Sequence, residues 1–154
     1  MIYVVEIKVR LQINTSQEQV WDIISNVDND SDFWRGTTSI RNLSKDGNII
    51  TREIVLGENN RCTQKLTIYP KEEISIRWIK GVISGTKAIL LTPIGRATLL
   101  EVQMNYKFSG VGNLASKRLA TLFQNEAEFA VELIKEKSEW RERDIPMTEK
   151  SWMV

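Results

Sequence analysis

The feature that most constrains this fold is a long strand-like run at the start of the chain and one long helical run near its end. Residues 2–13 alternate apolar and polar side chains, which is the period-two pattern of a strand with one buried face. Apolar residues recur at helical spacing over about residues 112–143. A single long helix after a series of strands predicts a sheet whose open face is covered by that helix.

The segments between these two runs predict two short helices and six further strands. Thr15 with Glu18 fits a capping box, and Ser16 with Gln19 offers a second register for the same helix start. Residues 28–34 fit another short helix, because Asp and Asn favour helix caps. The strand-like runs cover residues 37–45, 49–56, 61–69, 73–80, 86–92 and 97–108. Short turns between them, such as Asp46-Gly47, predict antiparallel hairpins in one twisted sheet.

Length and charge narrow the class of protein. The 154 residues suit one domain, which we place at 1–143, and the last residues 144–154 carry Pro146 and no clear period, so we expect a loose tail. A net charge of +1 provides no field to attract nucleic acid, and no RNA-binding motif appears. No apolar run reaches the roughly 18 residues of a membrane span, and charge comes too early for a signal peptide, so we expect a cytoplasmic protein.

The residue types that are missing exclude several kinds of chemistry. The chain has no histidine, which removes the commonest general base and the commonest metal ligand. Cys62 is its only cysteine, so no intrachain disulfide can form, and the residue is interpreted as a small buried hydrophobe. Neither a serine–histidine nor a cysteine–histidine pair can be built, and a binding role is favoured over an enzymatic one. We expect no cofactor and no metal.

Three local motifs, together with the order of elements, resemble a known family. The motifs are Ser16-x-Glu18-x-Val20-Trp21-Asp22-Ile23-Ile24, Phe33-Trp34 after the second helix, and the turn Ser109-Gly110-Val111-Gly112. They resemble the START-like (SRPBCC) superfamily of polyketide cyclases and lipid carriers over about residues 2–140. The resemblance implies an α+β helix-grip fold, in which about seven curved antiparallel strands wrap around a long C-terminal helix and two short helices follow the first strand. It also implies an apolar cavity between sheet and helix that holds a hydrophobic molecule.

The long helix supplies the first candidate site residues. Each residue advances about 100° around the axis. A face centred on Ala115 contains Leu119, Leu122, Glu126, Phe129, Ala130 and Leu133. Glu126 lies within that apolar stripe, and three interpretations stay open. The helix is rotated so that Glu126 reaches a wet edge, or Glu126 pairs with a base such as Arg52, or it lines a ligand cavity as a polar anchor.

The strands supply the remaining candidates. Arg52 shares its strand face with Ile50 and Ile54, where it could bind a ligand carboxylate or carbonyl, unless the opposite face of the strand is buried and Arg52 is exposed. Trp78 and several residues of the last strand could line a pocket, and core packing explains them equally well. The predicted ligand-binding residues are Arg52, Trp78, Leu100, Met104, Tyr106, Leu119, Leu122 and Glu126.

The leading functional hypothesis is binding or carriage of a small hydrophobic or amphipathic ligand, such as a lipid, an isoprenoid or a polyketide-like compound. The hypothesis derives mainly from the family resemblance. One alternative is a cyclase- or hydratase-type enzyme, with Glu126 as base and Arg52 polarising a carbonyl. The other is a protein-docking module that uses a sheet edge or the terminal helix. The sequence names no protein partner.

Overall fold

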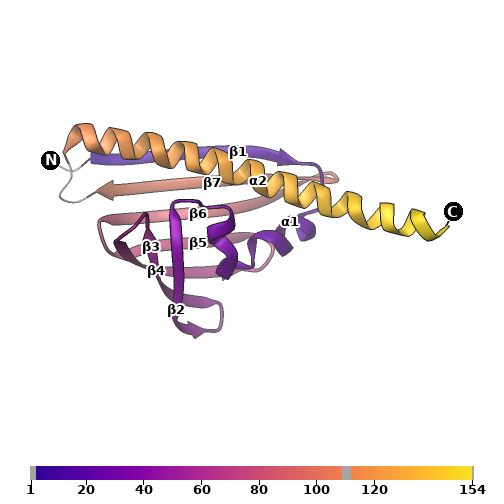
Figure 1. Ribbon diagram of the computed structural model, residues 1–154, viewed down its shortest axis with the longest axis horizontal. Helices are drawn as coiled ribbons and strands as arrows, with labels where there is room; N and C mark the ends of the chain where they lie inside the picture. The colour runs from indigo at the N-terminus through magenta and orange to yellow at the C-terminus, as the bar shows by residue number, and fades with distance from the viewer. Residues whose placement is uncertain (1–2, 109–111, 154) are drawn as a thin grey trace.

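The computed structural model describes residues 3–108 and 112–153, with the side chains of residues 3, 113 and 141–153 left out of the description. These residues form three helical segments and seven strands (Figure 1). In chain order they are β1 (Tyr3–Ile13), α1 (Gln17–Ile24), η1 (Val27–Asp32), β2 (Thr37–Asp46), β3 (Ile49–Leu56), β4 (Asn60–Tyr69), β5 (Glu73–Lys80), β6 (Ile83–Ile94), β7 (Ala97–Phe108) and α2 (Asn113–Met153).

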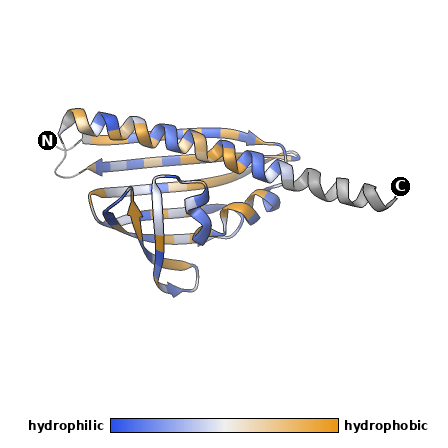
Figure 2. Ribbon diagram, in the orientation of Figure 1, coloured by the Kyte–Doolittle hydropathy of each residue, from blue (hydrophilic) through white to orange (hydrophobic). Residues whose placement is uncertain are grey.

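The strands form one antiparallel sheet in the order β1-β7-β6-β5-β4-β3-β2. Helix α2 runs along β1 and β7, and it also packs on α1 (Figure 1). Hydrophobic and hydrophilic residues alternate along the strands, as the period-two pattern predicts (Figure 2). This is the helix-grip arrangement, so the predicted fold class is confirmed.

Local signals place most element boundaries within a few residues of their predicted positions. Ser16 caps α1, because its Oγ accepts a hydrogen bond from the Gln19 amide at 3.2 Å, which selects the second of the two predicted capping registers. Strand β6 begins at Ile83, before the predicted start at residue 86, and therefore includes Gly85. Gly85 has a φ of 131°, and a Cβ there would lie 1.9 Å from the Asn105 carbonyl oxygen. Only glycine lets the two backbones approach this closely.

Helix α2 buries a different face from the predicted one. Its buried residues are Ser116, Ala127, Ala130, Val131, Ile134 and Ser138. Leu122 and Phe129, which were predicted to face the sheet, are 62% and 47% exposed. The predicted face was therefore turned by about one residue, or about 100°. The buried face combines small side chains with Val131 and Ile134 and packs against β1, whereas Leu122 and Phe129 lie outside this contact.

The C-terminal end also differs from prediction. The backbone is helical through Met153, where a loose tail was expected over residues 144–154. The helical backbone therefore extends past residue 143, where the predicted helix ends. Within residues 3–108 and 112–153, no helix combines the length and the apolar character that crossing a membrane requires.

Candidate functional site

A small polar cavity lies between the sheet and α2. Its volume is about 20 Å³, which is room for about one water molecule. Its lining combines buried charges with aromatic and sulfur-containing side chains from the sheet, η1 and α2. The lining residues are Asp30, Trp34, Thr37, Arg52, Leu56, Gln64, Trp78, Lys87, Met104, Tyr106, Phe123 and Glu126.

Arg52 is the best-paired charge in this cavity. It is 3% exposed, so β3 turns it inward, which settles the choice of strand face that the sequence left open. Its Nε donates to Gln64 Oε1 at 2.9 Å, and its two terminal nitrogens donate to the Val27 carbonyl at 2.9 Å and to Asp30 Oδ2 at 2.8 Å. Burial raises the pKa of the Asp30 carboxyl, and the Arg52 charge opposes that rise. These bonds tie η1 to β3 and β4.

Lys87 is a second buried cation, and it lacks such partners. It is 7% exposed, and its Nζ lies 3.0 Å from the centroid of the Trp34 ring. No hydrogen bond or ion pair reaches this Nζ from the residues that the structure describes. Burial lowers the pKa of Lys87 to about 7, even though the negative charges of Glu126 and Asp30 act in the opposite direction. The sequence indicates that Lys87 points inward, because it lies on the same strand face as the buried residues Ile89 and Leu91.

Aromatic rings cover one side of the cavity. Tyr106 makes edge-to-face contacts with Trp78 at 5.6 Å and with Phe123 of α2 at 5.3 Å. The Phe123 ring also stacks on Phe108 at 5.9 Å. Burial raises the pKa of the Tyr106 hydroxyl, and the nearby Trp78 N–H acts in the opposite direction. The hydroxyl and the Trp78 N–H are close to each other, but their geometry is not that of a hydrogen bond. The buried Trp78 Nε1 therefore has no hydrogen-bond acceptor in the described protein.

Glu126 closes the cavity from the α2 side. It is half-buried, and its Oε1 accepts a long hydrogen bond of 3.3 Å from the Gly36 amide. A Cβ on Gly36 would lie 2.8 Å from Glu126 Oε2, so the absence of a side chain there permits this approach. Glu126 thus lies at the cavity edge, and its negative charge acts on Lys87.

The structure brings together five of the eight predicted site residues: Arg52, Trp78, Met104, Tyr106 and Glu126 line one cavity. The other three lie elsewhere. Leu100 is fully buried in the core, and Leu119 packs against the core without reaching the cavity. Leu122 points to solvent, because α2 is rotated relative to the predicted face.

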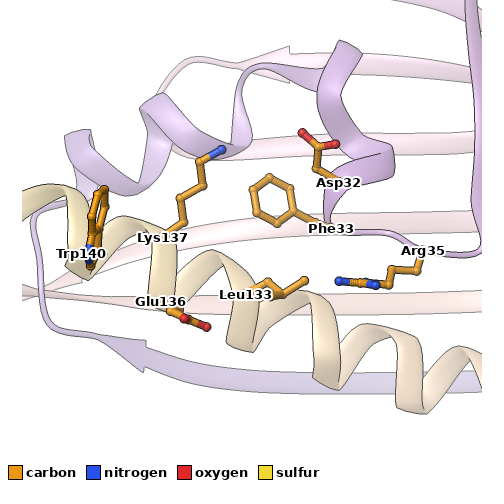
Figure 3. A pocket seen from close by; sticks show the side chains of 7 residues that line it. All are labelled: Asp32, Phe33, Arg35, Leu133, Glu136, Lys137 and Trp140. Atoms are coloured by element: carbon orange, nitrogen blue, oxygen red, sulfur yellow. The ribbon is translucent and has the colours of Figure 1, made fainter.

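A larger groove lies on the surface between η1 and the second half of α2 (Figure 3). Its volume is about 390 Å³, and it is lined by Asp32, Phe33, Arg35, Leu133, Glu136, Lys137 and Trp140. Lys137 Nζ lies 5.4 Å from the centroid of the Phe33 ring, and Trp140 is 62% exposed. The groove carries two positive and two negative side chains and none of the predicted site residues, so it offers no preference for a charged ligand.

The described residues offer little to a metal ion or a reactive thiol. No group of three or more acidic or cysteine side chains is arranged to bind a metal in the described part of the chain. Cys62 is buried, and burial raises the pKa of its thiol, which disfavours the nucleophilic thiolate.

Comparison with known structures supports the fold assignment. The chain is similar to the Zhui aromatase/cyclase from a Streptomyces species, with a TM-score of 0.80 and 13% identity over 90% of this chain and 96% of that one. A Thermus thermophilus protein has a TM-score of 0.74, with 15% identity over 86% of this chain and 96% of that one. A START superfamily protein from Mycobacterium smegmatis has a TM-score of 0.67, with 17% identity over 86% of this chain and 98% of that one. At these identities the likeness shows the fold alone.

Sequence comparison identifies the family. A search of curated protein sequences finds no significant match. The family model described as polyketide cyclase/dehydrase and lipid transport matches residues 13–132, which is most of the chain. The match begins at the last residue of β1, continues through β2 to β7 and includes the part of α2 that closes the cavity. The chain therefore belongs to the polyketide cyclase/dehydrase and lipid transport family.

Proposed function

We propose that this protein binds a small hydrophobic or amphipathic molecule, such as a lipid, an isoprenoid or a polyketide-like compound, between the sheet and α2. The observation that carries the proposal is the buried donor Trp78 Nε1, which has no acceptor among the described residues and shares an aromatic-walled cavity with the Lys87 side chain. Buried donors are nearly always paired in folded proteins, and each unpaired one costs about 1–3 kcal/mol. A ligand oxygen that entered the cavity would supply the missing acceptor.

Ligand entry requires the cavity to expand, because its present volume holds about one water molecule. The structure suggests where α2 would separate from the sheet. Farther along the helix, Lys135 Nζ donates to the Gln12 carbonyl at 2.9 Å, and the Asn14 amide donates to Glu139 at 2.8 Å. Over the cavity, by contrast, the Glu126 side chain makes one long hydrogen bond among the described residues, to the amide of Gly36 just before β2. Opening near Glu126 would therefore break fewer interactions than opening near Glu139.

Native mass spectrometry on the purified protein tests this proposal. The protein is exposed to cell lipid extract and, separately, to a fatty acid, an isoprenoid alcohol and a tricyclic aromatic phenol. We expect a discrete added mass with at least one of them, together with a change in tryptophan fluorescence because Trp34 and Trp78 line the cavity. A clean unliganded mass under every condition would contradict ligand binding.

A matched pair of α2 variants then tests where the ligand binds. Glu126→Gln alters the cavity edge, whereas Glu128→Gln alters an exposed position of the same helix. We expect Glu126→Gln to change ligand affinity several-fold and Glu128→Gln to leave it unchanged. Equal affinities for both variants and the wild type would remove Glu126 from the site.

A second candidate function is a cyclase- or hydratase-type reaction on such a ligand. The observation that favours it is that Glu126 and Arg52 line the same cavity. A base (Glu126) and a group that polarises a carbonyl (Arg52) must both contact the same substrate. Arg52, however, already makes three hydrogen bonds to the protein, which leaves it fewer donors for a substrate. Incubation with a poly-β-ketone thioester surrogate and product identification by mass spectrometry tests this function. Cyclisation that matches the rate without protein would reject it.

A further inference from the structure

We propose that Lys87 is an amine nucleophile that forms a reversible imine with aldehyde or ketone ligands in the cavity. The inference rests on the proposed function, because the cavity must admit a ligand before Lys87 can react with it. It goes further in assigning the ligand a carbonyl group and the protein a covalent step.

The first support is the position of the amine. A lysine usually extends its ammonium group into water, whereas Lys87 Nζ lies inside the cavity against the Trp34 ring and receives no acceptor from the described protein. Desolvation and the nearby Arg52 charge both disfavour the ammonium form, and together they outweigh the opposing charges of Glu126 and Asp30. With the pKa of Lys87 lowered to about 7, roughly half of the molecules carry a free amine at neutral pH. A free, desolvated amine is the form that attacks carbonyl carbons.

The second support is the set of groups around the amine. Trp78 Nε1 is a buried donor without an acceptor in the same cavity, so it can donate a hydrogen bond to a ligand carbonyl oxygen. Glu126 Oε1 accepts from Gly36, and the other oxygen of the same carboxylate accepts no hydrogen bond from the described residues. A carboxylate in this position can move protons between the nitrogen and the oxygen. The titratable or charged groups that face Lys87 are Asp30, Arg52, Tyr106 and Glu126.

The reaction balances without an oxidant or a further reactant. The lone pair of Lys87 Nζ forms a bond to the carbonyl carbon, the carbonyl π pair moves to oxygen, and Glu126 carries one proton from the nitrogen to that oxygen, which gives a neutral carbinolamine. Glu126 then carries the second proton from the nitrogen to the hydroxyl group, and water leaves as the C=N bond forms. The net change is amine plus carbonyl to imine plus water, and hydrolysis reverses it.

Reductive trapping tests the inference. The protein is incubated at pH 7 with benzaldehyde and sodium cyanoborohydride, which reduces an imine to a stable secondary amine, and the modified lysines are identified by peptide mass spectrometry. We expect Lys87 to be modified at least tenfold faster than exposed lysines such as Lys65. An ordinary lysine with a pKa near 10.4 is only about 0.04% free amine at pH 7. The rate at Lys87 should reach half of its maximum near pH 7. Modification of Lys87 no faster than that of Lys65 would overturn the inference.

Benzyl alcohol and the variant Lys87→Met separate this inference from the proposed function. Benzyl alcohol matches benzaldehyde in shape but cannot form an imine, so both the wild type and Lys87→Met should bind it, as read from tryptophan fluorescence. Circular dichroism checks that the variant is folded. Binding of both compounds without attachment to Lys87 refutes the imine and leaves ligand binding intact. Failure of the wild type to bind either compound counts against the inference and the proposed function together.

Discussion

Removing the buried amine of Lys87 should change how the stability of the protein depends on pH. The substitution Lys87→Met keeps an unbranched side chain in the cavity, one heavy atom shorter than lysine, and removes the charge. In the unfolded chain the amine has its ordinary pKa of 10.5, and in the folded protein burial lowers it to about 7. Between these two values the unfolded state holds the proton and the folded state does not. Wild-type stability must therefore rise with pH across this window, and the variant lacks this rise.

The magnitude follows from the size of the window. Each pH unit between the two pKa values contributes about 1.4 kcal/mol, so about 4 kcal/mol would accumulate between pH 7 and pH 10. The contact of the ammonium with Trp34 favours the charged form by about 1 kcal/mol. This contact brings the folded-state pKa of Lys87 closer to the unfolded value and so narrows the pH window. We expect the free energy of unfolding of the wild type, relative to that of Lys87→Met, to increase by about 3 kcal/mol from pH 6 to pH 10.

Urea denaturation, followed by circular dichroism at five pH values from 6 to 10, measures this difference. Lys65→Met is the matched control, because Lys65 lies on the exposed face of β4. Its stability should follow the wild type at every pH. If the wild-type and Lys87→Met curves stayed parallel within about 0.5 kcal/mol, Lys87 would not be desolvated in solution and the reasoning would fail.

Four further substitutions test the packing around the cavity and the orientation of α2. Arg52→Met should lower the free energy of unfolding by about 3–5 kcal/mol, since it leaves a buried carboxylate unpaired, and urea denaturation checks it. Gly36→Ala should cost about 1 kcal/mol, because the new Cβ displaces the flexible Glu126 carboxylate and breaks its hydrogen bond; a loss above 3 kcal/mol would mean that the backbone moves instead. On α2, Ile134→Ala should cost about 2–4 kcal/mol in thermal or urea unfolding, and Leu122→Ser should cost under about 0.5 kcal/mol. Equal losses at these two α2 positions would refute the observed rotation of the helix.

The sheet could be predicted closely from the sequence, because strand periodicity is a local property. Each residue in a strand points to the face opposite its neighbour, so the parity of Ile50 and Ile54 places Arg52 inward once that face is buried. Turn residues such as Gly47, with a φ of 59°, mark the hairpins independently of tertiary contacts. The element order and the family resemblance then left one plausible arrangement for the long helix.

The rotation of α2 could not be predicted from hydrophobicity alone. Apolar residues occupy two adjoining faces of its sequence, and the spacing predicts burial of the face with Leu122 and Phe129. The structure buries the face with Ala127, Val131 and Ile134 instead, and Ala130 lies where the two faces meet. The same rotation makes one predicted site residue wrong, because Leu122 was predicted to line the cavity and is exposed.

The sequence by itself determined the order of elements and the strand faces, because these depend on residues close together in the chain. It also excluded histidine chemistry, because the chain contains no histidine. Only the tertiary structure decided which charges meet. Asp30 and Arg52 come from η1 and β3, and Lys87 lies on a strand that does not pair with either. Whether a buried charge finds a partner depends on distances between elements far apart in sequence. That is why Arg52 is satisfied and Lys87 is left facing the cavity.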